Sequence, residues 1–504
     1  MMKNLLATIA IALIVPIGLQ AQSDEDALRY SMMNFGGTAR FMGSGGAFGA
    51  LGGDFSTLST NPAGLGIYRS SEFTFTPALT NFNTSSDFFG STTNTDRYNF
   101  NISNAGLVLG GVKNGKENNT TGWVGGAFAI GFNRLENYNN RVVYTGFNDR
   151  NSITDYYADQ LSSNGGTNPS DAYNYDPFGA GLAWETFLLN PEPTDSTSYY
   201  SVVNGGNVQQ TKTIVQSGAL DEMVISFAGN YGNKLYIGAT IGVPFVNYNR
   251  TVTFAEEDIN NVHNEFNSMS QLESLETSGA GINGKFGIIY RVNEFVRLGG
   301  AIHTPTALGL RDFYFTSMSS NLGAGGSYSY DSPQGQYDYS LITPWRAFGS
   351  LALTFQKYGF ISFDYEFVDY SSSNFNFNRI GSSSDIILET ELNNAIDLKY
   401  RDASNFRIGA ELVYEIFRLR GGYTIMGTPF ASGVATGNAD FARTSYSIGA
   451  GIRERSFFAD FAFVNTQSTE YDIQYNYSNA LGANEGANLN RSINNFVFTM
   501  GFKF

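Results

Sequence analysis

The feature that most constrains this chain is the rhythm of its connections. From Glu72 to the C-terminus, about fourteen segments alternate apolar and polar residues, and each reaches the roughly 9 to 11 residues that a tilted membrane strand needs. Short turns and long links join these segments in alternation, which is typical of barrels with tight turns on one side of a membrane and long loops on the other. The sequence therefore predicts an all-β fold, a transmembrane antiparallel β-barrel of about 14 strands. The expected strands are 72–83, 97–111, 121–136, 213–231, 234–254, 272–290, 295–315, 337–356, 359–370, 400–414, 417–427, 441–453, 456–471 and 491–504.

The alternation within these strands predicts one apolar face and one polar face. In the segment 359–370, for example, Ile361 and Phe363 alternate with Ser362 and Asp364. We expect the apolar face to meet lipid and the polar face to line the lumen. Mixed charges there favour ion pairs that support the barrel and its contents, and the alternative is an arginine that holds a ligand carboxylate. The candidate lumen charges are Arg346, Asp364, Glu366, Arg407, Glu411, Arg418 and Arg420, with Arg443 and Asp460 beside them.

The N-terminus has the layout of an export signal. Lys3 precedes an apolar run over 5–17, and small residues follow up to Ala21. A transmembrane anchor is the alternative, but the run is shorter than the ~20 residues that span a bilayer. We expect residues 1–21 to be a cleavable signal peptide and the protein to lie in a cell outer membrane of the Gram-negative type.

The stretch 36–66 is rich in glycine and has neither a helical nor a strand period, which favours a compact plug. We therefore expect residues 22–71 to form an N-terminal hatch inside the lumen of a barrel that spans 72–504. Asn61, Pro62, Ala63, Gly64 and Leu65 predict a tight turn, since proline fixes φ and asparagine can bond its own backbone. Phe41, Phe48 and Phe55 are the candidate ligand-lining residues of the hatch.

Two further segments carry specific expectations. The longest link, 137–212, falls on the external side by parity and is long enough to fold back as a cap. The chain ends in apolar residues at every second position from Phe496 to Phe504, a pattern like the C-terminal strand that the barrel assembly machinery recognises. We expect outer-membrane lipids and that machinery among the partners.

Composition excludes several classes of function. A formal charge of -15 argues against a nucleic-acid partner. The absence of cysteine removes thiol nucleophiles, thiolate metal sites and a lipidated cysteine at the mature end. His263 and His303 are the only histidines, so neither a serine–histidine–acid site nor a metal cluster has support in the residue spacing. We expect no enzyme activity and no cofactor.

Six loose motifs, in order along the chain, resemble those of the FadL/TodX family of outer-membrane transporters for hydrophobic compounds. They are the Gly-x-Gly-Gly-Ala-Phe run at 43–48, the Asn-Pro-Ala-Gly-Leu run at 61–65, the pair of runs at 297–299 and 303–305, and the runs at 407–411, 419–423 and 446–451. The resemblance covers most of the mature chain. The sequence departs from the family in the acidic start of the hatch at 23–26 and in the size of the 137–212 link.

The resemblance implies a fourteen-stranded barrel closed by the hatch and a kinked third strand that leaves a side opening beside the Asn61–Pro62 turn. Gly122, Gly125, Gly126 and Gly131 lie in the expected third strand and are candidates for that kink, although they also suit plain strand packing.

The resemblance further implies passive uptake of hydrophobic molecules, either long-chain fatty acids or aromatic hydrocarbons, with gating by the hatch and lateral exit. Two alternatives stay open. The first alternative is a general porin, although a porin does not need so long a plug. Measurement of single-channel conductance would distinguish a porin from a gated channel. Some barrels similar to this family serve instead as subunits of an outer-membrane protein secretion and surface-attachment system, and long aromatic loops would suit such a partner protein.

Overall fold

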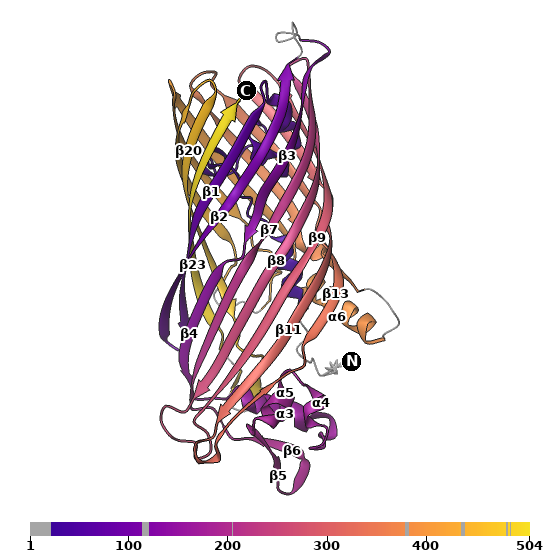
Figure 1. The fold of residues 1–504 in the computed structure, drawn as a ribbon, viewed down its shortest axis with the longest axis vertical. Coiled ribbons are helices and arrows are strands. Elements are labelled where there is room, and N and C mark those ends of the chain that lie inside the picture. Colours follow the sequence, from indigo (N-terminus) through magenta and orange to yellow (C-terminus); the bar gives the residue numbers. More distant parts are fainter. Residues whose placement is uncertain are drawn as a thin grey trace, which may run out of the picture.

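A computed structural model describes residues 22–112, 120–203, 205–377, 383–434, 439–479, 482–483 and 485–504. Figure 1 shows an upright barrel with part of the N-terminal chain inside it. One sheet contains nineteen strand segments, and its first segment pairs with its last, so the ring is closed. Its segments are β1 (Glu72–Phe88), β2 (Ser91–Val112), β3 (Trp123–Asn137), β4 (Asn140–Asn148), β7 (Val208–Tyr231), β8 (Leu235–Glu257), β9 (Ser268–Arg291), β10 (Val296–His303), β11 (Ala307–Asn321), β12 (Ser327–Asp331), β13 (Gly335–Ile342), β14 (Arg346–Thr354), β15 (Gly359–Asp369), β16 (Asn374–Phe377), β17 (Asp402–Tyr414), β18 (Phe417–Met426), β19 (Arg443–Arg453), β20 (Phe457–Asp472) and β23 (Ala487–Lys503).

The nineteen segments make fourteen strands, because four strands are interrupted. β3 continues as β4, β10 as β11, β15 as β16, and β12 through β14 form one strand in three pieces. Three of the interruptions contain a proline, which cannot donate to a ladder: Pro305, Pro333 and Pro344. The predicted fourteen-stranded antiparallel barrel is confirmed.

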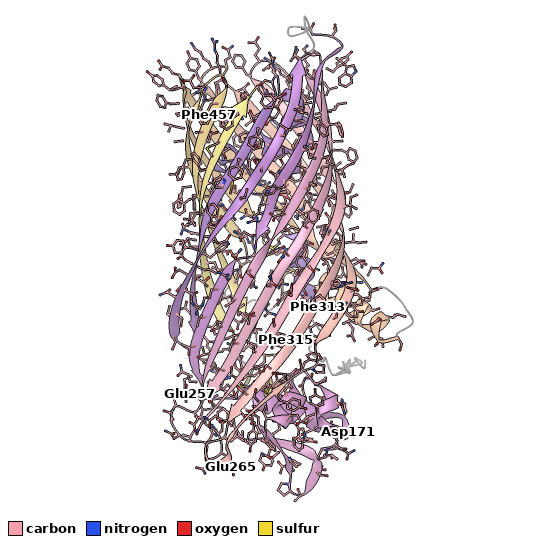
Figure 2. The ribbon with its side chains drawn as sticks, viewed as in Figure 1. Asp171, Glu257, Glu265, Phe313, Phe315 and Phe457 are labelled. Atoms are coloured by element: carbon pink, nitrogen blue, oxygen red, sulfur yellow. The ribbon has the colours of Figure 1, made fainter. Side chains whose placement is uncertain are left out.

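The two ends of the barrel differ. At the turn end, short connections join β7 to β8, β9 to β10, β14 to β15, β17 to β18 and β19 to β20, and the C-terminus lies there too (Figure 1). At the cap end the connections are long. Figure 2 shows Phe457 at the turn end and Asp171, Glu257 and Glu265 at the cap end. This contrast is the predicted alternation of tight turns and long loops.

The outer surface is apolar near the turn end and polar toward the cap end. On β9, Phe286 and Ile288 are about half exposed, whereas Glu276 and Ser278 are the exposed side chains farther along. On β23 the exposed residues near the turn end are Phe498 and Phe502. An outward apolar band of this kind is the lipid-facing surface of a transmembrane β-barrel. Strands extend past the band: β2 spans Ser91–Val112, where the sequence predicts only 97–111, because polar segments beyond the band still pair.

Residues before β1 fold into the lumen as four short helices. These are α1 (Asp24–Ser31), α2 (Ala39–Gly43) and the 3₁₀ helices η1 (Phe55–Ser59) and η2 (Pro62–Ile67). Caps explain where they begin, since Thr38 accepts a hydrogen bond from the Phe41 N–H and Asp54 accepts one from the Ser56 N–H. We call residues 22–71 the hatch. Its Tyr30, Phe41 and Phe48 belong to the largest buried apolar cluster of the molecule.

A small separate layer covers the cap end. It contains α3 (Ile153–Ser162), η3 (Ser163–Gly165), α4 (Ala172–Tyr175), α5 (Ala180–Glu185) and a hairpin of β5 (Leu189–Glu192) and β6 (Asp195–Ser201). The predicted link 137–212 is therefore too wide: β4 occupies 140–148 and β7 starts at Val208, which leaves 149–207 as the cap. A helix inside another predicted link, α6 (Ser383–Lys399), lies beside the barrel, and its Asn393 side chain bonds both the N–H and the C=O of Phe375 on β16. The remaining short elements are η4 (Gly323–Gly325), η5 (Tyr370–Ser372), β21 (Ser478–Asn479) and β22 (Gly482–Ala483).

Candidate functional site

The turn predicted at Asn61 is the start of η2. The Asn61 Oδ1 accepts a hydrogen bond from the Ala63 N–H at 3.1 Å, and its Nδ2 donates to the carbonyls of Gly49 (2.6 Å) and Ile288 (3.2 Å). A Cβ on Gly287 would lie 1.9 Å from Asn61 Oδ1, so glycine is required there for close approach. The turn thus binds the hatch to β9, where the wall is continuous on the β8 side.

The wall is interrupted elsewhere, between β2 and β4. β2 pairs with β3 only from Asn104 to Val112, and β3 stops at Asn137. β4 then pairs with β7. Among the described residues, 91–102 of β2 have ladder partners on β1 and none on β4. We call this line between β2 and β4 the seam.

Side chains close the seam where the backbone ladder is missing. Asn137 Nδ2 donates to Asn99 Oδ1 at 3.1 Å, and Thr95 Oγ1 donates to the Arg141 carbonyl at 2.9 Å. Arg97 Nη1 donates to the carbonyls of Asn140 (3.1 Å) and Gln216 (2.7 Å), so one guanidinium links β2, β4 and β7. Unpaired backbone groups are costly in lipid, and these bonds satisfy several of them.

The hatch meets the seam through residues 34–37, which we call the strap. The N–H groups of Asn34 and Gly36 donate to the carbonyls of Leu135 and Arg134, each at 2.9 Å. The Gly37 N–H donates to Ser103 Oγ at 3.0 Å. A Cβ on Gly36 would lie 2.8 Å from the Arg134 carbonyl, so the strap lies directly against the wall.

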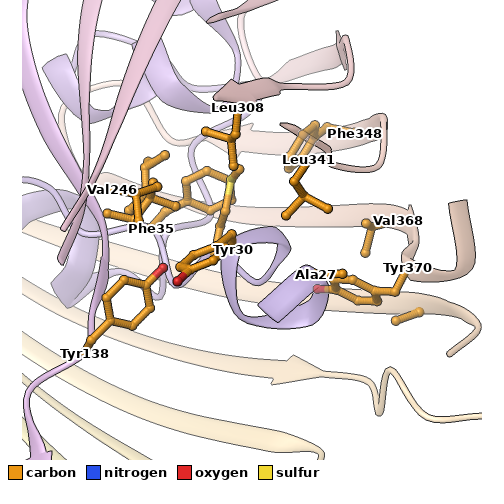
Figure 3. Close-up of a cluster of buried hydrophobic side chains, with 14 of the residues drawn as sticks. Ala27, Tyr30, Phe35, Tyr138, Val246, Leu308, Leu341, Phe348, Val368 and Tyr370 are labelled. Carbon is orange, nitrogen blue, oxygen red and sulfur yellow. The ribbon is translucent and has the colours of Figure 1, made fainter. Parts of the chain in front are cut away.

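Aromatic side chains continue this contact into the lumen. The rings of Tyr30 on α1 and Tyr138 at the end of β3 meet edge to face with centroids 6.3 Å apart, and Figure 3 shows both in the cluster that also holds Phe35 of the strap. The Tyr138 hydroxyl donates to the Arg29 carbonyl at 3.4 Å. The expected neighbour of the break was the Asn61–Pro62 turn, and the structure corrects this: the strap lies at the break, because η2 packs against β7, β8 and β9.

Of the four glycines predicted to form the kink, Gly125 alone lies at an irregularity of β3. Gly131 pairs with Gly106, and a Cβ on either would strike the ring of Phe55, so the two form a socket for that hatch residue. Gly125 adjoins a bulge near the turn end, Gly122 precedes β3 with a positive φ, and Gly126 lies within the β2–β3 ladder. The strand instead breaks after Asn137, beyond all four glycines.

The predicted lumen charges fall into two buried groups. In the first, Glu366 accepts from Arg346 and from Arg407 (2.6 Å), and Arg346 also donates to the Ser31 carbonyl at the end of α1. In the second, Arg420 Nε lies 2.7 Å from Glu411 and its Nη1 lies 2.6 Å from Asp460. Arg40 of α2 reaches the same Glu411 at 3.5 Å.

These pairs attach the hatch to the wall, and Asp364 does the same by accepting from the Gly49 N–H at 2.9 Å. Arg443 lies 3.6 Å from Glu136 across the lumen. Arg418 is a correction: it faces the lumen side of β18 but lies at the rim, where it donates to the carbonyls of Glu415 and Phe417 in its own turn. Because a buried charge without a partner is costly, both groups favour a structural role.

One cavity of about 50 Å³ lies between the hatch and β17–β20, with room for only a few water molecules. Its walls include Phe35, Phe41, Met42, Met426 and Arg407. Phe48 is stacked behind Phe41 with centroids 5.6 Å apart, and Phe55 occupies its glycine socket away from this space. Of the three predicted ligand-lining residues, the structure places only Phe41 on the cavity.

Sequence reasoning missed Arg97, Asn99 and Asn137. A signal was available, since asparagines gather at 99, 101 and 104 and again at 137, 139 and 140, and asparagine is depleted in strands. In the described part of the chain, no three His, Cys, Asp or Glu residues are grouped to hold a metal. No described helix is long and apolar enough to cross a bilayer.

Comparison with solved structures identifies the architecture. The chain aligns with a FadL homologue of Pseudomonas aeruginosa at a TM-score of 0.55 and 12% identity, over 94% of this chain and 100% of the other. The chain has the FadL/TodX barrel fold. It aligns with the toluene transporter TodX of P. putida at a TM-score of 0.51 and 13% identity, over 93% and 99% of the two chains. No family model and no curated protein matches the sequence.

Proposed function

We propose that this protein is an outer-membrane channel for passive uptake of hydrophobic molecules, with gating by the hatch and lateral exit through the seam. The observation that carries the proposal is the strap: the hatch that fills the lumen also bonds the end of β3, where the wall lacks a ladder. The FadL/TodX fold supports it, and the TodX structure is described as that of a toluene transporter.

The seam faces a suitable environment for lateral exit. Tyr98 and Phe100, on the outer face of β2 beside the seam, are 64% and 71% exposed and continue the apolar band. A molecule leaving the lumen here would pass directly to lipid. Transfer of its apolar surface out of water supplies roughly 25 cal/mol per Å².

The small space beside the hatch supports gating by the hatch. A cavity of about 50 Å³ is too small for a fatty acid or toluene, so a ligand enters only when Phe35 and Phe41 move. Phe35 lines the cavity, while its neighbours Asn34 and Gly36 hold β3. Movement of Phe35 on ligand entry would therefore also move Asn34 and Gly36 and release the seam. Ligand binding itself would drive this change, so transport would need no energy source.

The test is uptake of labelled dodecanoate and labelled toluene by cells that make the full chain, compared with cells that do not. Faster entry of either compound is expected. Equal rates for both compounds would refute transport. The same cells test export. If residues 1–21 are removed as a signal peptide, the product in the outer membrane is shorter than the full chain. If the assembly machinery inserts the barrel through its C-terminal strand, that product is also heat-modifiable.

A role in protein secretion or surface attachment is the second candidate. One observation favours it: the cap exposes Phe187 by 50% and Tyr200 by 39%, and exposed aromatic side chains suit a protein partner. Recovery of a stoichiometric partner protein with the purified barrel, together with loss of secretion when the barrel is deleted, would support this candidate over transport.

A further inference from the structure

The seam is lined by amides rather than by apolar side chains. A chain of hydrogen bonds runs from Asn101 to Asn99 (3.3 Å), from Asn137 to Asn99 (3.1 Å), from Asn139 to Asn137 (2.9 Å) and from Asn139 to the Gly218 carbonyl (3.3 Å). It crosses from β2 over the end of β3 to β7. Any molecule that parts the seam must break this chain.

Arg97 adds a positive charge to the same line. Its guanidinium has two backbone carbonyls as partners, and no carboxylate forms an ion pair with it among the residues that the structure describes. A guanidinium binds a carboxylate more strongly than it binds a neutral carbonyl. The nearby outer pair of Arg134 and Asp221 is already complete, with bonds of 2.9 and 3.0 Å. Arg97 is therefore a cation of the seam that a headgroup can recruit, and its side chain, unlike that of the exposed Arg141 on β4, bonds across the seam.

Given the proposed channel, on which this inference rests, we infer that the seam selects amphiphiles with a polar, anionic headgroup over bare hydrocarbons, and that Arg97 receives the headgroup. The tail of such a molecule would lie along Tyr98 and Phe100 while its head replaces the broken amide bonds. A hydrocarbon replaces none of them. Each buried polar group left unpaired weakens the open state on the order of tenfold.

The experiment measures the ratio of dodecanoate uptake to toluene uptake in cells that make the full chain. The wild-type ratio should exceed that of Arg97→Gln by about tenfold, because the variant loses one charge-assisted bond. Arg455→Gln is the matched control: it removes the same charge from an exposed side chain in the turn between β19 and β20, away from the seam, and the ratio should not change.

Arg97→Lys separates loss of the charge from misfolding of the variant. It keeps the charge, so its ratio should stay well above that of Arg97→Gln, and heat-modifiable migration reports folding of every variant. A wild-type ratio near one, or equal ratios in wild type and Arg97→Gln, would overturn the inference while leaving the channel intact. Absence of uptake of both compounds would instead refute the channel itself.

Discussion

The wall between β7 and β8 and the wall between β2 and β4 belong to one barrel but are closed in different ways. β7 and β8 pair without interruption from Gln209–Glu257 to Tyr231–Leu235. β2 and β4 share no ladder among the described residues and are joined by Arg97 and Thr95, while Asn99 bonds Asn137 at the end of β3. Backbone groups of a ladder have no alternative partner in lipid, whereas a side-chain bond contributes about 0.5–1.5 kcal/mol and can be exchanged. The ladder between β7 and β8 should therefore stay closed, whereas the side-chain bonds between β2 and β4 can separate at lower cost.

The largest effect is expected from locking the seam. The chain has no cysteine, so Asn99→Cys with Asn137→Cys would place a single pair of thiols on the two sides of the seam, which a short cleavable thiol cross-linker can join. Cross-linking should reduce uptake to that of cells without the protein, and cleavage of the linker should restore it. The control is Thr213→Cys with Thr253→Cys, a directly paired position of the β7–β8 ladder, where cross-linking should leave uptake unchanged. Normal uptake by the locked seam variant would exclude lateral exit there.

A smaller effect is expected from crowding the strap. Gly36→Val places side-chain atoms against Arg134 and Ser103, and overpacking of this kind costs about 1–3 kcal/mol in free energy of unfolding. We expect a lower melting temperature and more frequent openings in single-channel records. Gly111→Val on β2 has open space around its Cβ and should change neither quantity. A silent Gly36→Val would mean that the strap does not hold the seam.

Deleting one side-chain bond on each wall sharpens the comparison further. Asn99→Ala removes the bond to Asn137, and Ser226→Ala removes the 2.6 Å bond to Thr240 between β7 and β8. Each should cost about 1 kcal/mol in free energy of unfolding. Only Asn99→Ala should raise basal conductance, because the ladder still closes the other wall. Equal conductance in the two variants would remove the distinction between the walls.

The smallest effect concerns the cap, which is held by a buried apolar core rather than by exchangeable polar bonds. Burial raises the pKa of Asp155 at the start of α3 from 3.8 to about 6. The folded cap thus binds this proton more tightly than the unfolded cap, so the contribution of Asp155 to its stability should fall as pH rises from about 4 to 6. Hydrogen exchange over 153–162 measures this.

Asp155→Asn should make the pH slope in that window shallower, because Asp176 of the cap, whose pKa burial also raises, still titrates. The variant also weakens the bond that Asp155 accepts from the Ser152 N–H. A variant that keeps the wild-type slope would assign the pH dependence to another group.

The local pattern of the sequence was enough to predict the barrel and the hatch in its lumen. Period-two alternation predicted the strands, and the charges on the inward positions of β15, β17 and β18 lie in the lumen as expected, apart from Arg418 at the rim. The turn at Asn61 followed from the conformational preferences of asparagine and proline alone. Each of these features depends on residues close together in the chain.

What only the tertiary structure decided is where the wall is weak and what closes it. Gly131 has no side chain, and the sequence alone therefore predicts a kink there. In the structure, the ring of Phe55, from a distant part of the chain, occupies the space beside Gly131. Arg97, Asn99 and the strap meet only because β3 ends at Asn137 and the hatch passes behind it. The pattern of a strand predicts which face a residue occupies. The partner of that residue depends on strand register and on the path of the N-terminal chain. Packing between segments far apart in sequence fixes both the register and that path.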